Sequence, residues 1–187
     1  MLSPACRITV TETEPIVTPR DPSAPHNFGC ASHRDDTLFT AERPGHFQKE
    51  FPTTIIEDWV EFMKGKGIHN VLIIMDDNEF DVYSVDLKQF YRQAGMNVYH
   101  IPYSGPDSYD KIMNLIQSLD ARGEKVVSHC TGGKGRCGRV ACAWICKKWS
   151  LSPLEASQDF IDQAVEHGLY RLADVQKLKK WIGYGSC

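Results

Sequence analysis

The chain has 187 residues, the length of one domain with a short extension. Its 42% apolar and 24% charged residues exclude a disordered or fibrous chain and indicate one sizeable core. The net charge of -3 comes from 21 basic and 24 acidic residues without a long run of one sign, which argues against general nucleic-acid binding.

The chain carries no apolar run of membrane-spanning length, and residues 1–10 lack the pattern of a secretory signal. We therefore expect a cytoplasmic protein without stable membrane insertion. Arg7 and Arg20 suit an organelle transit peptide, whereas Glu12, Glu14 and Asp21 argue against one, so organelle targeting stays open. An odd number of unevenly spaced cysteines favours free thiols in a reducing compartment: Cys6, Cys30, Cys130, Cys137, Cys142, Cys146 and Cys187.

The first residues have the composition of a flexible tail. Half of the prolines lie between Pro4 and Pro25, among threonines, serines and glutamates, with few large apolar side chains to bury. We therefore predict a flexible tail over residues 1–25.

Beyond the tail, helical and extended patterns alternate. Apolar residues repeat at helical spacing over residues 55–63 and stop at Gly65, and residues 71–75 form a short apolar run typical of a strand buried on both faces. A second helix around residues 87–91 ends at Gly95, and a second strand follows over residues 97–101.

The same alternation continues to the middle of the chain and then stops. A helix over residues 108–121 precedes a strand at residues 125–128, and after residue 137 only helical patterns occur, over residues 140–149, 154–165 and 172–182. We predict an α/β fold: a single domain with a central, mostly parallel twisted sheet flanked by helices, and a helical C-terminal part. Ligands of such sheets bind at the carboxyl ends of the strands.

The segment 129–139 lies between a buried strand and a helix and is rich in glycine. Gly133, Gly135 and Gly138 match a dinucleotide fingerprint formally, but its acidic partner, Asp159, falls in a helical pattern rather than at a strand end. A Walker-type nucleotide loop fails too, because Gly135 stands where Ser or Thr should follow Lys134.

A nucleophile loop fits the segment better. Glycines between Cys130 and Arg136 let successive backbone N–H groups point inward and form an anion nest, and the helix that follows adds its positive end. Such surroundings lower the pKa of a cysteine from about 8.5 into the range of roughly 3.5 to 7.5. Arg136 offers two parallel hydrogen bonds to phosphate oxygens.

The pattern His-Cys-x-x-Gly-x-x-Arg, here His129, Cys130, Gly133 and Arg136, resembles the signature of the cysteine-dependent protein tyrosine phosphatases. The resemblance covers roughly residues 53–183. It is strongest to the dual-specificity phosphatases and, among them, to the kinase-associated phosphatase branch, which acts on cyclin-dependent kinases. The segments that carry this likeness are residues 100–102, 126–130 and 152–156.

The resemblance implies a phosphatase domain over residues 26–187 and a mechanism that needs no metal or other cofactor. Cys130 would attack phosphorus and form a phosphocysteine that water then hydrolyses. Arg136 and the amides of the loop would bind the phosphate oxygens. The phosphate-binding residues implied are Thr131, Gly132, Gly133, Lys134, Gly135 and Arg136.

The same mechanism requires a general acid, which in the family comes from the loop after the strand at residues 97–101. The family position falls on Gly105, and the nearest carboxylate is Asp107, which we predict to be the acid. Asp110, Asp76 and Asp77 remain alternatives.

Two residues beside the loop have supporting roles. Cys137 stands where the family has Ser or Thr, which predicts slower breakdown of the phosphocysteine, a redox role with Cys130, or an inert substitution. His129 directly precedes the nucleophile and is expected to orient the backbone through hydrogen bonds.

We expect a phosphoprotein substrate, such as a kinase, carrying phosphotyrosine, phosphoserine or phosphothreonine, and a monomeric enzyme. Lys134 leaves a phosphoinositide substrate open, although Thr131 stands where lipid phosphatases of this superfamily have a second basic residue. A phosphate-binding pseudophosphatase with little turnover is the remaining alternative.

Overall fold

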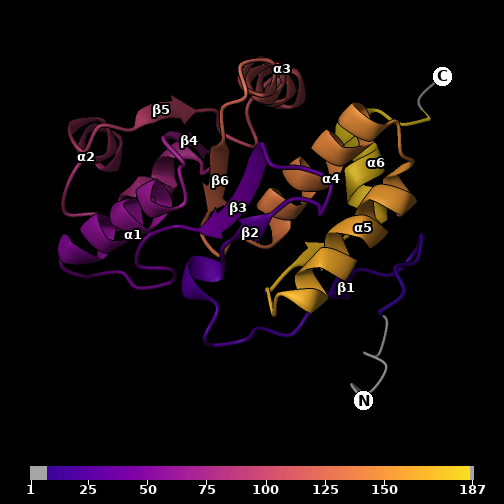
Figure 1. Ribbon diagram of the computed structural model, residues 1–187, viewed down its shortest axis with the longest axis horizontal. Coiled ribbons are helices and arrows are strands. Elements are labelled where there is room, and N and C mark those ends of the chain that lie inside the picture. Colours follow the sequence, from indigo (N-terminus) through magenta and orange to yellow (C-terminus); the bar gives the residue numbers. More distant parts are fainter. Residues whose placement is uncertain (1–7, 186–187) are drawn as a thin grey trace.

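The computed structural model describes residues 8–185, which fold around a central five-stranded sheet (Figure 1). The strand order is β2-β3-β6-β4-β5, and only β2 runs antiparallel to its neighbour. The strands are β2 (Gly29–Cys30), β3 (Leu38–Glu42), β6 (Val126–Cys130), β4 (Asn70–Ile73) and β5 (Asn97–His100). The predicted mostly parallel α/β sheet is confirmed.

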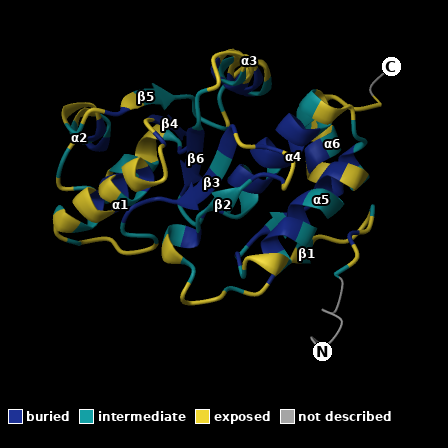
Figure 2. Cartoon of the chain, in the orientation of Figure 1, coloured by how far each residue is buried: buried dark blue, intermediate teal, exposed yellow. Residues whose placement is uncertain are grey.

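Helices cover both faces of this sheet (Figure 1). α1 (Thr54–Gly65) and α2 (Leu87–Gln93) pack on one face, and the other face is covered by α3 (Ser108–Ala121), α4 (Gly135–Trp149), α5 (Pro153–Glu166) and α6 (Val175–Ile182). Figure 2 shows that α4 is largely buried, and α5 and α6 pack mainly on α4 rather than on the five-stranded sheet. The helices predicted over residues 55–63, 108–121, 140–149 and 154–165 lie within or coincide with α1, α3, α4 and α5.

The strands divide their side chains between two hydrophobic clusters. Val71 and Ile73 of β4 pack with α1 and α2, while Leu72 between them packs with the helices of the opposite face. Val126 and Val127 of β6 divide in the same way. This alternation explains why residues 71–75 form a continuous apolar run and why every residue of β6 is buried, since both faces of a parallel strand are covered.

Four strands lie outside the predicted pattern, and three of them have only two residues. β3 lies directly beside β6, yet Thr40 and Glu42 interrupt its apolar run. β1 (Ile16–Val17) and β7 (Leu172–Ala173) form a separate antiparallel pair, so residues 172–173 are extended rather than the start of the last helix. The two-residue strands β1, β2 and β7 carry too few residues for a recognisable period.

The N-terminal segment packs on the domain over its described part, where a flexible tail was expected. Val10 is buried, Ile16 and Val17 pair with β7, and the Thr18 hydroxyl donates a hydrogen bond to the Leu169 carbonyl. The few apolar residues of this segment therefore find a partner far along the chain. Residues 1–7 of the predicted tail lie outside the described residues.

No helix within residues 8–185 is long and apolar enough to cross a membrane.

Candidate active site

The glycine-rich segment forms a loop between β6 and α4, as predicted. Cys130 is the last residue of β6, and α4 begins at Gly135. Gly133 has a φ of +65°, and a Cβ atom there would lie 2.5 Å from the carbonyl carbon of Ala41 in β3. Only glycine fits this position without strain, so β3 presses directly on the loop.

The carbonyl groups of the loop are bound from outside by residues distant in sequence. The buried Arg171 donates a hydrogen bond of 3.2 Å to the Gly133 carbonyl, and the Asn27 amide donates one of 3.1 Å to the Gly132 carbonyl. The backbone N–H groups of Gly133 and Cys137 bond to the Cys130 sulfur. The loop thus holds its donors around the nucleophile, as an anion nest requires.

The Cys130 thiol is surrounded by groups that stabilise its ionised form. The Cys137 thiol, with its Sγ 3.4 Å from the Cys130 Sγ, donates a hydrogen bond that lowers the pKa of Cys130. Burial opposes this effect, but the charge of Arg136 and the two amides add to it, and the pKa of Cys130 falls to about 6. Burial raises the pKa of Cys137 well above its ordinary value, so this thiol stays protonated.

This arrangement predicts the pH dependence of alkylation at Cys130. The lowered pKa of Cys130 means that the thiolate forms as the pH rises through about 6, so the rate of iodoacetamide inactivation should reach half its maximum near that pH. In Cys137→Ala the donor is lost and the midpoint should move upward, while Cys137→Ser keeps a hydroxyl donor and a low midpoint. A wild-type midpoint near the ordinary value of about 8.5 would contradict the assignment.

Arg136 is held by a carboxylate that sequence reasoning missed. Both of its terminal nitrogens donate to Glu79, one to each carboxylate oxygen, and the Thr131 hydroxyl donates to the same carboxylate at 2.6 Å. Burial would raise the pKa of Glu79, but these bonds outweigh it and lower the pKa to about 2. Glu79 belongs to the short 3₁₀ helix η2 (Asp77–Phe80), and the spacing Asp76-x-x-Glu79 of its capping box was the available signal.

Glu79→Gln should reduce turnover although the nucleophile Cys130 is still present. The neutral amide cannot accept from both nitrogens of Arg136, so the guanidinium is no longer fixed, and we expect a loss of roughly 100-fold in kcat with a smaller change in KM. Steady-state kinetics on an aryl phosphate measure this split. Glu124→Gln, at a partly exposed carboxylate paired with Arg122, is the control. An unchanged kcat in Glu79→Gln would show that Arg136 needs no such partner.

The predicted general acid does not contact the loop in the described part of the chain. Asp107 is the N-cap of α3 and lines a surface hollow with Asp110, Tyr109 and Trp181, and no hydrogen bond or ion pair joins either aspartate to Cys130 or Arg136. Asp76, one of the alternatives, lies at the site: its Oδ2 is 3.9 Å from Arg136 Nη1.

His129 and Lys134 have other partners than expected. His129 is fully buried, and its Nε2 lies 3.3 Å from the Tyr91 hydroxyl, whereas its Nδ1 has no partner among the described residues, so its bond is to a side chain rather than to the backbone. Burial lowers the pKa of His129 to about 3 and keeps the ring neutral. The Lys134 ammonium donates 2.7 Å to the Tyr170 hydroxyl and lies over its ring.

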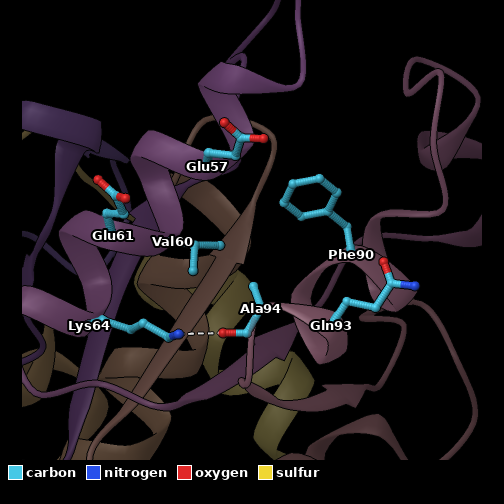
Figure 3. Close-up of a pocket in the computed structure, with 7 residues that line it drawn as sticks. All are labelled: Glu57, Val60, Glu61, Lys64, Phe90, Gln93 and Ala94. Carbon is cyan, nitrogen blue, oxygen red and sulfur yellow. Dashed lines mark hydrogen bonds between the residues drawn. The ribbon is translucent and has the colours of Figure 1, made fainter.

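The other features considered in the sequence lie outside the phosphate loop. Asp159, weighed as a ribose ligand, lies within α5 and accepts a hydrogen bond from Ser32. No group of three His, Cys, Asp or Glu side chains within residues 8–185 is arranged to hold a metal ion. A hollow of about 340 Å³ between α1 and α2 contains none of the predicted site residues (Figure 3); Val60 and Phe90 line it, and Lys64 bonds to the Ala94 carbonyl at one side.

The sequence is similar to a phosphatase family and to one curated mammalian protein. The profile of a family described as "Polymorphic toxin system, DSP-PTPase phosphatase" matches residues 47–149, just over half of the chain. The chain is also 32% identical over 125 residues to mouse cyclin-dependent kinase inhibitor 3. That match covers 64% of the chain and 59% of the mouse protein, so the chain spans less than two thirds of this relative.

The fold is similar to those of solved phosphatases. The kinase-associated phosphatase, crystallised with its catalytic cysteine replaced by serine, superposes with a TM-score of 0.67 over 94% of this chain and 97% of its own, at 20% identity. PTPMT1 in complex with PI(5)P superposes with a TM-score of 0.61 over 82% and 93%, at 14% identity. At these identities the likeness concerns the fold alone.

Proposed function

This chain belongs to the DSP-PTPase phosphatase family, and we propose that it hydrolyses phosphate monoesters on proteins with Cys130 as nucleophile. The proposal rests on the surroundings of the Cys130 sulfur, which has two backbone amides, the Cys137 thiol donor and the charge of Arg136 around it. These groups hold a thiolate at neutral pH, which is the attacking species in cysteine catalysis.

The geometry supports a two-step reaction through a phosphocysteine. Cys130 lies at the base of the loop, so the inward amides that surround its sulfur also face the oxygens of a phosphate above it. Arg136 is fixed by Glu79 and can donate to the same oxygens as charge develops on them. The phosphoryl group then passes to sulfur and from sulfur to water.

For the substrate, we infer a phosphoprotein carrying phosphotyrosine, phosphoserine or phosphothreonine, with a kinase as the leading candidate. The support is the likeness to mouse cyclin-dependent kinase inhibitor 3 and to the kinase-associated phosphatase. A phosphoinositide is less favoured, because the ammonium of Lys134, the residue that raised this alternative, is directed to the Tyr170 hydroxyl.

The proposal is tested with reduced wild-type protein in EDTA. We expect hydrolysis of an aryl phosphate and of phosphopeptides, faster than that of phosphoinositide vesicles, and an acid-quenched protein that carries phosphate on Cys130 by peptide mapping. Activity that vanishes in EDTA, or phosphate trapped on another residue, would overturn the mechanism. Binding of vanadate without turnover would instead identify a pseudophosphatase.

A further inference from the structure

The loop that follows β5 offers no carboxylate to the phosphate loop. It runs from Ile101 to Asp107, and the family position of the acid is Gly105. Asp107 already begins α3, with its backbone in the left-handed region at φ 55°, and its side chain makes no capping bond. A carboxylate that contacts both this loop and Arg136 comes instead from the end of a different strand, β4.

Asp76 occupies the space between the two loops. It follows β4, whose neighbours in the sheet are β6, which ends at Cys130, and β5, which leads into the loop after it. Its Oδ2 lies 3.9 Å from Arg136 Nη1, and its Oδ1 accepts from the backbone N–H of Ser104 at 3.4 Å and from the Ser104 hydroxyl. Ser104 of the loop after β5 thus binds a carboxylate that follows the neighbouring strand β4.

The other carboxylates around the site bind groups outside the loop after β5 or are turned to solvent. Both oxygens of Glu79 bind Arg136, and its pKa of about 2 keeps it ionised, which disqualifies it as a proton donor. The side chain of Asp77 is 83% exposed and faces His100 at 3.9 Å. Glu42 is paired with Arg20 and His46.

We propose that Asp76 is the general acid of this enzyme, in place of an aspartate on the loop after β5. The inference rests on the proposed phosphatase function and adds the residue that protonates the leaving group. The charged groups that face Asp76 are Arg136 from α4 and Glu79 from η2.

The proton balance of the reaction is complete with these residues. In the first step the Cys130 thiolate forms a bond to phosphorus, the bond to the leaving oxygen breaks, and the Asp76 carboxylic acid gives that oxygen its proton, which leaves a phosphocysteine, an alcohol or phenol, and the Asp76 carboxylate. In the second step the Asp76 carboxylate takes a proton from water as the water oxygen bonds to phosphorus, and the sulfur leaves as thiolate.

Substrates whose leaving groups differ in acidity distinguish a general-acid role of Asp76 from a structural one. A phenol as acidic as dinitrophenol leaves without a proton, whereas the tyrosine of a phosphopeptide requires one. Asp76→Asn should therefore lower kcat for a phosphotyrosyl peptide by about 100-fold and kcat for dinitrophenyl phosphate by less than about threefold. Asp77→Asn, at the adjacent exposed position, is the matched control.

Asp107→Asn is the competing variant. If it, rather than Asp76→Asn, shows the leaving-group effect, the inference about Asp76 fails while the phosphatase function stands. Equal losses on both substrates in Asp76→Asn would also overturn the inference, because they indicate a damaged phosphate loop. A wild-type protein inactive on both substrates would contradict the proposed function itself, which the other two outcomes leave intact.

Discussion

Cys130→Ser is expected to lower the hydrolysis of an aryl phosphate by about a million-fold, the scale on which a hydrolase loses its rate with its nucleophile. The Cys130 thiol has a pKa of about 6 and is ionised at neutral pH, whereas a serine hydroxyl in the same place is not. The amides of Gly133 and Cys137 remain, so the phosphate should still bind. Steady-state kinetics and equilibrium binding of a phosphopeptide measure the two effects separately.

The matched control for this variant is Cys142→Ser. Cys142 lies on α4 and is buried like Cys130, but burial raises the pKa of its thiol, so it carries no thiolate. We expect Cys142→Ser to keep its turnover within about threefold, apart from any loss of folded protein, which circular dichroism corrects. A Cys130→Ser protein with more than a tenth of the wild-type rate would contradict a nucleophilic role.

The elements that could be predicted from the sequence are those whose apolar residues recur with a regular period. β4 and the helices α1, α3 and α5 each carry enough apolar residues for their type to be predicted from the sequence alone. β3 could not be read in that way, because it buries Thr40 and Glu42 in the middle of the sheet. Its place is set by pairing with β6, a contact between residues more than eighty positions apart.

The same distinction applies to the candidate site. Cys130, Arg136 and the glycines between them are contiguous, so their chemistry follows from local spacing. Glu79 and Arg171 fix this loop from distant positions, and a single sequence carries no record of such contacts. From the sequence, Asp76 was a candidate only because it follows a strand. Its bond to Ser104 joins two loops that become neighbours only when β4 and β5 pair in the sheet, so this contact could not be predicted.

Arg136→Lys is expected to reduce kcat/KM for an aryl phosphate by roughly 1,000-fold, mostly through kcat. Lysine keeps the positive charge but has no planar fork, so it cannot bind Glu79 and two phosphate oxygens at once. The control is Arg139→Lys, one turn further along α4, where the side chain bonds to the Tyr103 hydroxyl. We expect this control to stay within about threefold, since partly exposed contacts of this kind contribute little.

A double variant tests whether Glu79 acts through Arg136. If Glu79 serves only to fix the guanidinium, Glu79→Gln should cost roughly 100-fold in the wild type and almost nothing once Arg136 is lysine, because the residue it positions is gone. Additive losses would mean that Glu79 has a second task, such as holding Thr131, whose hydroxyl bonds to the same carboxylate. An Arg136→Lys protein within tenfold of the wild type would show that charge alone, without the fork, suffices for phosphoryl transfer at this loop.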